Sequence, residues 1–460
     1  MFSRRGFLER CGGGLGSLAL AALLGRDERG VKRARAKRVV QLFMSGAASQ
    51  VDTFDYKPEL IRRHGQEFDP GGKVELFQST PGAVMQSPWK WRQHGECGKW
   101  VSDLVPHLAS CVDDIAFLQG MVSTSNVHGL ATFMQSTGFV QPGFPSMGAW
   151  VSYGLGALTD ELPTFVVLPD KRGFAPGGPR NWSAGFLPTQ HQAMMIRPDR
   201  PEPIFDLFPP ASADFITPSS EADGRAMLER LNRLHEEQRA DDVRLEARIA
   251  SYEMAARLQL SAPEALDLSG ETAEVRDLYG IDREPTADFG RRCLLARRLL
   301  ERGVRFLQVW SGADNGHPRR NWDSHEDLER DHANMAAEMD RPAAALLTDL
   351  KRRGMLDDTI VLWTTEFGRM PCSQGGKGRD HNPFGFTNWL AGGGIRGGVT
   401  YGATDEWSYK AVENPTYCYD VHATILHQLG LDHEQLTFRH NGIDRRLTDV
   451  SGRVLGEILE

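Results

Sequence analysis

Short apolar segments alternate with amphipathic segments along most of this chain. Six of the apolar segments are rich in β-branched or aromatic residues and are bounded by Gly, Pro, Asp or Ser, which predicts buried strands. They span residues 38–44, 115–119, 164–168, 304–310, 359–365 and 387–391. Because helical patterns lie between them, we expect an α/β fold with a doubly wound, mainly parallel sheet flanked by helices.

Two helical segments add detail to this architecture. Over residues 326–350, apolar or small residues recur every three or four positions, and we expect Pro342 to kink or split this helix, with Asp340 as the cap of a second piece. A long polar helix over residues 221–260 interrupts the strand pattern. Residues 221–285 are therefore predicted to form a helical insertion on the same domain.

The first 25 residues resemble a twin-arginine secretion signal. The arginine pair is Arg4 and Arg5, and the apolar stretch of 15 residues that follows is short for a membrane span, which needs about 20. Four glycines in this stretch disfavour the alternative of a buried helix. We expect export by the twin-arginine translocase to the periplasm or beyond, with cleavage and an uncleaved anchor both open. A basic linker over 26–37 then leads into the main domain, residues 38–460.

Composition limits the classes of partner. The formal net charge of −8 and the hydrophobic content of 40% describe a globular chain with a packed core. No concentrated basic surface is expected, so nucleic acid is excluded as the main partner. Six widely spaced cysteines exclude a cysteine-rich zinc module, while disulfide pairing and oligomeric state stay open.

Carboxylates and imidazoles gather where predicted strands end. Ligands of open α/β sheets bind beyond the carboxyl ends of the strands. Neutral imidazole and carboxylate oxygen together are the ligand set for zinc, iron or manganese. The candidate metal ligands at these positions are Asp323, His325, Glu366, His381 and Asp52.

Each candidate also has a structural alternative. Asp323 alone is explained by capping the helix near Glu326, and His381 by a solvated loop. His128 lies in the first turn of a helix predicted over 125–138, where the positive helix end favours anions, or where it is simply a satisfied histidine in a capping loop. The combination of residues favours a shared metal or anion site over independent roles.

Several of these segments together resemble family 1501 of the bacterial domains of unknown function. The motifs are T-F-D with K-P, P-S-M-G-A-W-V-S-Y-G-L-G, W-D-S-H, E-F-G-R-M-P, G-R-D-H-N-P and A-G-G-G-I-R-G-G, spread from about Val39 to the C-terminus. That family looks like a branch of the alkaline phosphatase superfamily. The resemblance implies an alkaline phosphatase-like fold and an exported, metal-dependent hydrolase of sulfate or phosphate esters, acting on a small molecule or an extracellular polysaccharide.

The resemblance also implies roles for particular residues. The superfamily holds two metal ions, often zinc, and the matching ligands are Asp323, His325, Glu366 and His381. Phe367 stands where a second-metal histidine is usual, so one divalent ion, with zinc expected, fits better than two unless Asp52 or Asp55 rebuilds the second position. Within the four ligands, we expect Asp323 to be the weakest.

The usual nucleophile has no match in this sequence. His128 stands at the corresponding spacing and is expected to act as nucleophile or general base, with Arg369 neutralising the charge on the oxyanion. These departures keep a second class open: an exported binding or assembly protein that retains the fold without catalysis.

Overall fold

The computed structural model describes residues 34–205, 261–316 and 318–460 throughout, and residues 206–260 in part. Within these residues an eight-stranded sheet has the order β12-β4-β11-β8-β1-β7-β5-β6. Its strands are β1 (Arg38–Met44), β4 (Ile115–Met121), β5 (Phe165–Leu168), β6 (Met194–Met195), β7 (Phe306–Ser311), β8 (Thr359–Thr364), β11 (Phe386–Ala391) and β12 (Val399–Tyr401). Only β11 runs antiparallel to its two neighbours, so the doubly wound, mainly parallel sheet is confirmed.

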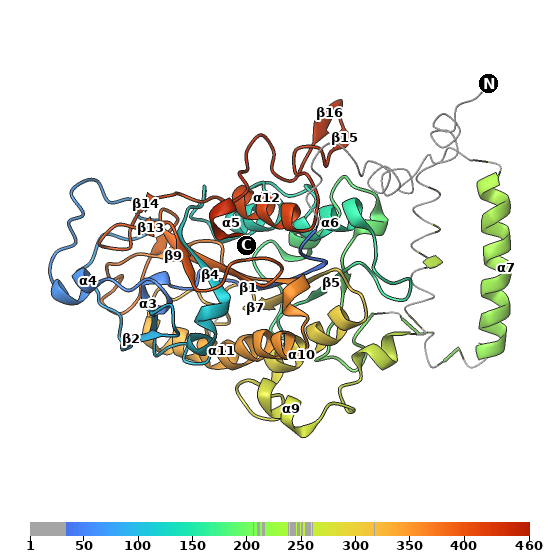
Figure 1. Cartoon of the computed structure of the whole chain (residues 1–460), viewed down its shortest axis with the longest axis horizontal. Coiled ribbons are helices and arrows are strands. Elements are labelled where there is room, and N and C mark those ends of the chain that lie inside the picture. The colour runs from blue at the N-terminus through green and yellow to red at the C-terminus, as the bar shows by residue number, and fades with distance from the viewer. Residues whose placement is uncertain are drawn as a thin grey trace.

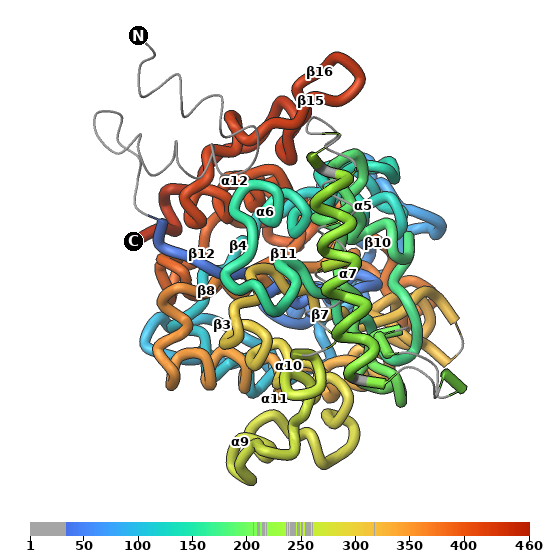
Figure 2. Tube along the Cα trace, turned by 90° about the vertical axis from the view of Figure 1, so that its right-hand side faces the viewer, coloured from blue at the N-terminus to red at the C-terminus, as the bar shows by residue number. Residues whose placement is uncertain are grey.

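Helices cover both faces of this sheet (Figure 1). On one face lie α10 (Ala287–Glu301) and α11 (Leu328–Arg352), and on the other lie α5 (His128–Thr137), α6 (Met147–Leu155) and α12 (Cys418–Gln428), as the turned view of Figure 2 also shows. Successive side chains of a strand point to opposite faces. Those of β1 accordingly alternate between two core clusters, with Leu42 in the cluster that contains α10 and Phe43 in the cluster that contains α6.

All six predicted strands are strands of this sheet. The boundaries of β1 agree with the prediction, and those of the other five differ by at most two residues at either end. The smaller elements are α3 (Gln50–Thr53), α4 (Pro58–Arg62), α7 (Pro218–Glu237), α9 (Ala273–Tyr279), β2 (Trp91–His94), β3 (Lys99–Ser102), β9 (Gly368–Arg369), β10 (His381–Asn382), β13 (Ala403–Thr404), β14 (Ala411–Glu413), β15 (Phe438–His440) and β16 (Ile443–Arg445).

Of the two predicted effects of Pro342, a kink or a split, the split is wrong. α11 continues through Pro342, because the buried side chains on either side of the proline pack into one core cluster. Its N-cap is Asp327, whose side chain accepts the N–H of Arg330. Asp340 caps nothing in α11; its carboxylate accepts the backbone N–H groups of His107 and Leu108 instead.

The predicted insertion contains α7 and α9, and α7 stands at the edge of the molecule in Figure 1. Its boundaries at 221 and 285 remain predictions, and the signal over 1–25 lies outside the described residues. Within the described part of the chain, no helix combines the length and apolar character needed to cross a bilayer. The five cysteines described there are all free.

Candidate metal centre

The sheet brings the ends of four strands to one edge. β1, β7 and β8 are parallel neighbours, and β4 points the same way because both it and β8 pair antiparallel with β11. The loop after β7 carries Asp323 and His325, and the chain leaving β4 reaches His128 at the start of α5. His381 in β10 precedes β11, whose N-terminal end lies at the same edge.

Three histidines surround one carboxylate oxygen at this edge. Asp323 Oδ1 lies 2.9 Å from His325 Nε2, 3.3 Å from His128 Nε2 and 3.4 Å from His381 Nε2. The two nitrogens His325 Nε2 and His381 Nε2 are 3.0 Å apart. We call these four residues the histidine cluster. All are buried except His325, which is partly exposed toward the solvent.

Hydrogen bonds on the far side of each ring fix its tautomer. His128 Nδ1 donates to Glu366 Oε1 at 2.7 Å, His381 Nδ1 to the carbonyl of Asn126 at 2.7 Å, and His325 Nδ1 to Gln374 Oε1 at 2.6 Å. Because all three acceptors are oxygens, each neutral ring carries its proton on Nδ1. The lone pair of each Nε2 therefore points into the cluster.

These lone pairs need a positive partner. His128 Nε2 is buried and has no hydrogen-bond partner within the described part of the chain, although Asp323 Oδ1 is near. Four-coordinate ions bound to imidazole and carboxylate at roughly 2.0–2.1 Å separate their ligand atoms by about 3.3 Å. The observed separations of 2.9–3.4 Å between Asp323 Oδ1 and the imidazole nitrogens, and between two of those nitrogens, agree with that value. The donors thus fit a divalent ion.

Two overlapping groups of three residues meet this geometry. The ligand atoms of His128, Asp323 and His381 lie within 4.8 Å of one another, and so do those of His325, Asp380 and His381. His381 belongs to both groups. The first group is entirely buried, whereas the second contains the more exposed His325 and an Asp380 carboxylate that already accepts from Ser79.

Burial and neighbouring charges together set the pKa values of the cluster residues. Burial alone would raise the pKa of Asp323, but the Arg369 guanidinium and the three imidazoles hold it far below its ordinary value. Burial lowers the pKa of His381 to about 3, which favours the neutral imidazole that a metal requires. Burial also opposes protonation of His128, yet the carboxylates of Asp323 and Glu366 raise its pKa. A proton and a metal ion therefore compete for His128 Nε2.

Glu366 and Arg369 contact residues of the cluster but do not belong to it. Glu366 Oε1 accepts from His128 Nδ1 and from the backbone N–H of Gly46, so its place is beside the ring of His128. The Arg369 guanidinium is fully buried and donates to Asp323 Oδ1 at 2.7 Å and to the carbonyl of Ala47 at 3.0 Å. Since it is sealed from solvent, Arg369 cannot meet an oxyanion, and its role is to hold Asp323.

Asp52 and Asp55 are engaged elsewhere. Asp52 Oδ2 accepts from Arg379 Nε at 2.9 Å and from Ser49 Oγ at 2.5 Å. Asp55 pairs with Lys57 and accepts from two hydroxyl groups. Neither aspartate belongs to a candidate ligand group among the described residues. Their carboxylates complete structural networks and do not rebuild a second metal position.

The start of α5 also differs from the expectation. Its N-cap is Val127, with no side-chain cap, and the backbone of Asn126 serves His381 instead. His332 on α11 also lies behind this edge, and the sequence pattern did not identify it as a site residue. His332 Nε2 accepts from the N–H of Ser49, and its Nδ1 donates to Ser324 Oγ at 2.8 Å. A buried histidine in an apolar stripe offers no signal that separates this bridging role from core packing.

A pocket of about 340 Å³ opens onto the cluster. Phe77, Val127 and Pro176 form apolar walls, and all four cluster residues line it. Arg319 is the guanidinium that reaches this pocket, with Nη1 3.3 Å from Asp323 Oδ2. No Ser, Thr or Cys side chain lines it among the described residues, so a hydroxyl or thiol nucleophile is missing there.

The sheet and the histidine cluster define an α/β protein with a candidate metal centre behind its strand ends. The chain belongs to the family described as "Protein of unknown function (DUF1501)", whose profile matches residues 36–459. A search of curated proteins finds no match.

Solved structures with a similar layout are members of the alkaline phosphatase and sulfatase group. The phosphonate monoester hydrolase SpPMH from Silicibacter pomeroyi is 13% identical, with 77% of this chain and 71% of that chain covered and a TM-score of 0.36. The PsFucS1 sulfatase from Pseudoalteromonas sp. is 14% identical, with 91% and 72% covered and a TM-score of 0.34. A protein in the alkaline phosphatase superfamily from Vibrio parahaemolyticus is 10% identical, with 87% and 68% covered and a TM-score of 0.35. Likeness at this level carries no weight for activity.

Proposed function

We propose that the protein is an exported, metal-dependent hydrolase of sulfate or phosphate esters. The observation that carries the proposal is the convergence of three Nε2 lone pairs on one buried carboxylate oxygen. A buried set of acceptors facing one another is costly unless a cation joins them. His128, Asp323 and His381 would hold one divalent ion, zinc being the expected metal, with His325 beside them at the pocket.

The surrounding residues support this assignment through their hydrogen bonds. Glu366 fixes the ring of His128 in the manner of the carboxylates that orient metal-bound histidines. Arg319, and not Arg369, is the guanidinium that faces the pocket, but it pairs with Asp323 and Glu326, so the bound ion would supply the positive charge for an ester anion. A bound ion of this kind polarises an ester oxygen and lowers the pKa of a bound water. His128, the expected nucleophile, is in this proposal a metal ligand.

A second candidate is an exported binding or assembly protein without catalysis. The observation that favours it is the lack of a hydroxyl or thiol at the pocket among the described residues. Under this alternative the cluster would hold its ion as a structural or ligand-binding group. Hydrolysis by a metal-activated water needs no such nucleophile, which is why the hydrolase stays the first candidate.

The experiment is metal analysis of protein folded in the cell, followed by a panel of activated sulfate and phosphate esters. We expect about one metal ion per chain in the wild type and none in His128→Ala, and hydrolysis of at least one ester by the wild type but not by His128→Ala. His94→Ala, a histidine on β2 outside the cluster, is the matched control. A metal-loaded wild type that hydrolyses no ester would favour the binding protein.

Export is tested separately. Arg4 and Arg5 form the pair that the translocase would read, so Arg4→Lys with Arg5→Lys should leave folded protein in the cytoplasm. Cell fractionation measures this outcome. Normal export of the double variant would exclude the twin-arginine route.

A further inference from the structure

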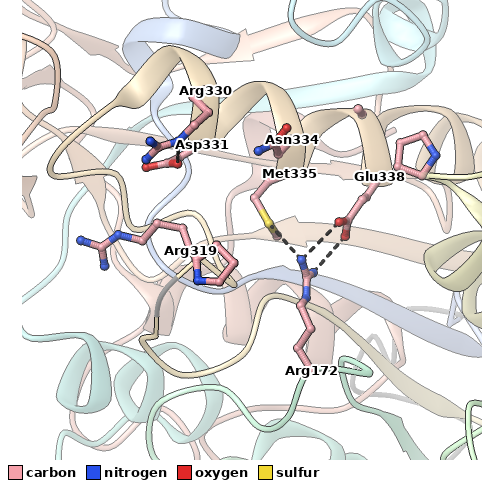
Figure 3. A pocket seen from close by; sticks show the side chains of 10 residues that line it. Arg172, Arg319, Arg330, Asp331, Asn334, Met335 and Glu338 are labelled. Atoms are coloured by element: carbon pink, nitrogen blue, oxygen red, sulfur yellow. Dashed lines mark hydrogen bonds and ion pairs between the residues drawn. The ribbon is translucent and has the colours of Figure 1, made fainter.

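A second and larger pocket adjoins the candidate metal centre. Its volume is about 490 Å³, and Arg319 lines both pockets. One wall is the N-terminal half of α11, and the opposite wall contains Arg172 from the loop after β5 (Figure 3). A ligand bound at the histidine cluster therefore has this pocket as its neighbour.

Asp331 is the unusual group in this pocket. Its side chain is 3% exposed, and Oδ1 accepts from Arg330 Nε at 2.8 Å. Oδ2 is buried and has no hydrogen-bond partner among the described residues. A buried carboxylate oxygen left in this state costs free energy until a donor meets it. Since Asp331 lines the pocket, that donor can come from a ligand there.

Every guanidinium in the pocket already faces a carboxylate. Arg172 binds Asp170 at 2.8 Å and Glu338 at 2.9 Å, the latter contact drawn in Figure 3. Arg319 pairs with Glu326, and Arg330 with Asp331. An anionic ligand would find these positive charges satisfied and would face Asp331 besides. A cation would lie among three guanidinium groups. Both signs of charge are therefore disfavoured.

A neutral group with hydroxyls fits what remains. A hydroxyl donates one hydrogen bond and accepts others, so it can meet Asp331 Oδ2 and also the amide of Asn334. No aromatic side chain lines the pocket among the described residues, so recognition there depends on hydrogen bonds.

We propose that this pocket binds a neutral, hydroxyl-rich group, the chemistry shared by sugar rings and by linear polyols, with Asp331 Oδ2 accepting from one of its hydroxyls. If the proposed function holds, this group is the alcohol side of the ester, and Arg319 lies where the two parts of the substrate meet. The assignment as a substrate subsite rests on that function, whereas hydroxyl binding itself does not.

The test is calorimetric titration of metal-free, full-length protein with methyl α-D-glucopyranoside, methyl β-D-galactopyranoside, glycerol and sodium sulfate. We expect at least one of the three neutral probes to bind with a Kd of about 1 mM, typical of a small ligand with a few good hydrogen bonds. The pyranosides and glycerol distinguish a ring from a linear polyol. Asp331→Asn replaces the acceptor with a donor and should weaken binding at least fivefold.

Three further variants keep the test decisive. Asp357→Asn, at an exposed position, should leave binding unchanged, and Asn334→Ala should weaken it even if Asp331→Asn fails to fold. His128→Ala should bind the neutral probe like the wild type, so a failure of the metal proposal leaves this result untouched. No binding of any neutral probe, tighter binding of sulfate, or indifference to both pocket variants would overturn the proposal.

Discussion

Two buried aspartate–arginine pairs lie behind the same edge of the sheet, and they differ in what completes them. Asp52 meets Arg379 at 2.9 Å, and the hydroxyl of Ser49 donates to it as well. Asp323 meets Arg369 at 2.7 Å, but its neighbours are imidazole nitrogens that carry lone pairs. The protein itself supplies hydrogen-bond donors around the first pair. Around the second pair, the imidazole lone pairs still need a cation or a proton.

The histidine cluster differs from an isolated buried histidine because several ligand atoms converge on one point. His422 Nδ1 is also buried without a hydrogen-bond partner, yet His422 belongs to no candidate ligand group among the described residues. A single imidazole nitrogen without a hydrogen-bond partner costs stability but does not by itself hold a metal ion. Three acceptors around one carboxylate oxygen form a site.

The largest effect should come from removing each aspartate. Asp323→Ala and Asp52→Ala both leave a buried guanidinium unpaired, so each should lower the free energy of unfolding by about 3–5 kcal/mol. Only Asp323→Ala should lose the metal. Denaturant unfolding and metal analysis of both variants measure this, and equal metal content would erase the distinction between the two pairs.

Removing the charge of Glu366 should weaken the metal without removing a ligand. Glu366→Gln keeps the shape beside His128 but lowers the basicity of the ring, so metal affinity should fall by about 10–100-fold. Asp55→Asn, in the complete network, should leave affinity unchanged. Competition with a metal chelator measures the metal affinity of both variants. An equal fall in affinity in Asp55→Asn would contradict the account.

Gly46 connects the first strand to the cluster. Its φ is +103°, its N–H donates to Glu366, and a Cβ there would lie 2.7 Å from the backbone nitrogen of Asp323. Gly46→Ala should cost about 2–3 kcal/mol and reduce metal content, since strain and a clash with backbone combine. Gly65→Ala is the control with strain alone, because φ is +81° and nothing lies within 4 Å. Similar losses of stability and metal content in both variants would show that the contact with the Asp323 loop is unimportant.

The smallest effect concerns His422, a buried histidine outside both pairs. Burial lowers its pKa to about 4, so the unfolded chain binds more protons than the folded chain between about pH 6.5 and pH 4. Stability from this group is complete above pH 6.5 and is lost as the pH falls. Between pH 7 and 5.5 the loss should be about 1.2 kcal/mol, and His422→Gln should remove it. Unfolding curves at the two pH values provide the check.

The sequence predicts the sheet well because its strands are buried and locally distinct. β1 reads as seven residues with β-branched and aromatic side chains, and its pairing between β7 and β8 follows from burial on both faces. The continuity of α11 through Pro342 was not predictable from local rules, since the packing on both sides of the proline decides it.

The same limit applies to the site. The rule that ligands bind beyond the carboxyl ends of the strands predicts that Asp323, His325 and His381 lie together. That rule depends only on topology. It does not say which oxygen or nitrogen each side chain presents. That Glu366 faces His128, that Asp52 faces Arg379 and that Arg369 is sealed from solvent all depend on rotamers and on loops that meet across more than 230 residues of sequence.

The central claim is that one cation completes the histidine cluster. The most direct measurement is anomalous X-ray diffraction from crystals of protein folded in the cell. We expect one anomalous peak at about 2.0–2.3 Å from His128 Nε2, His381 Nε2 and Asp323 Oδ1. Clear density for the four side chains with no peak between them would contradict the account, and would assign the cluster to a His128 imidazolium held between Asp323 and Glu366.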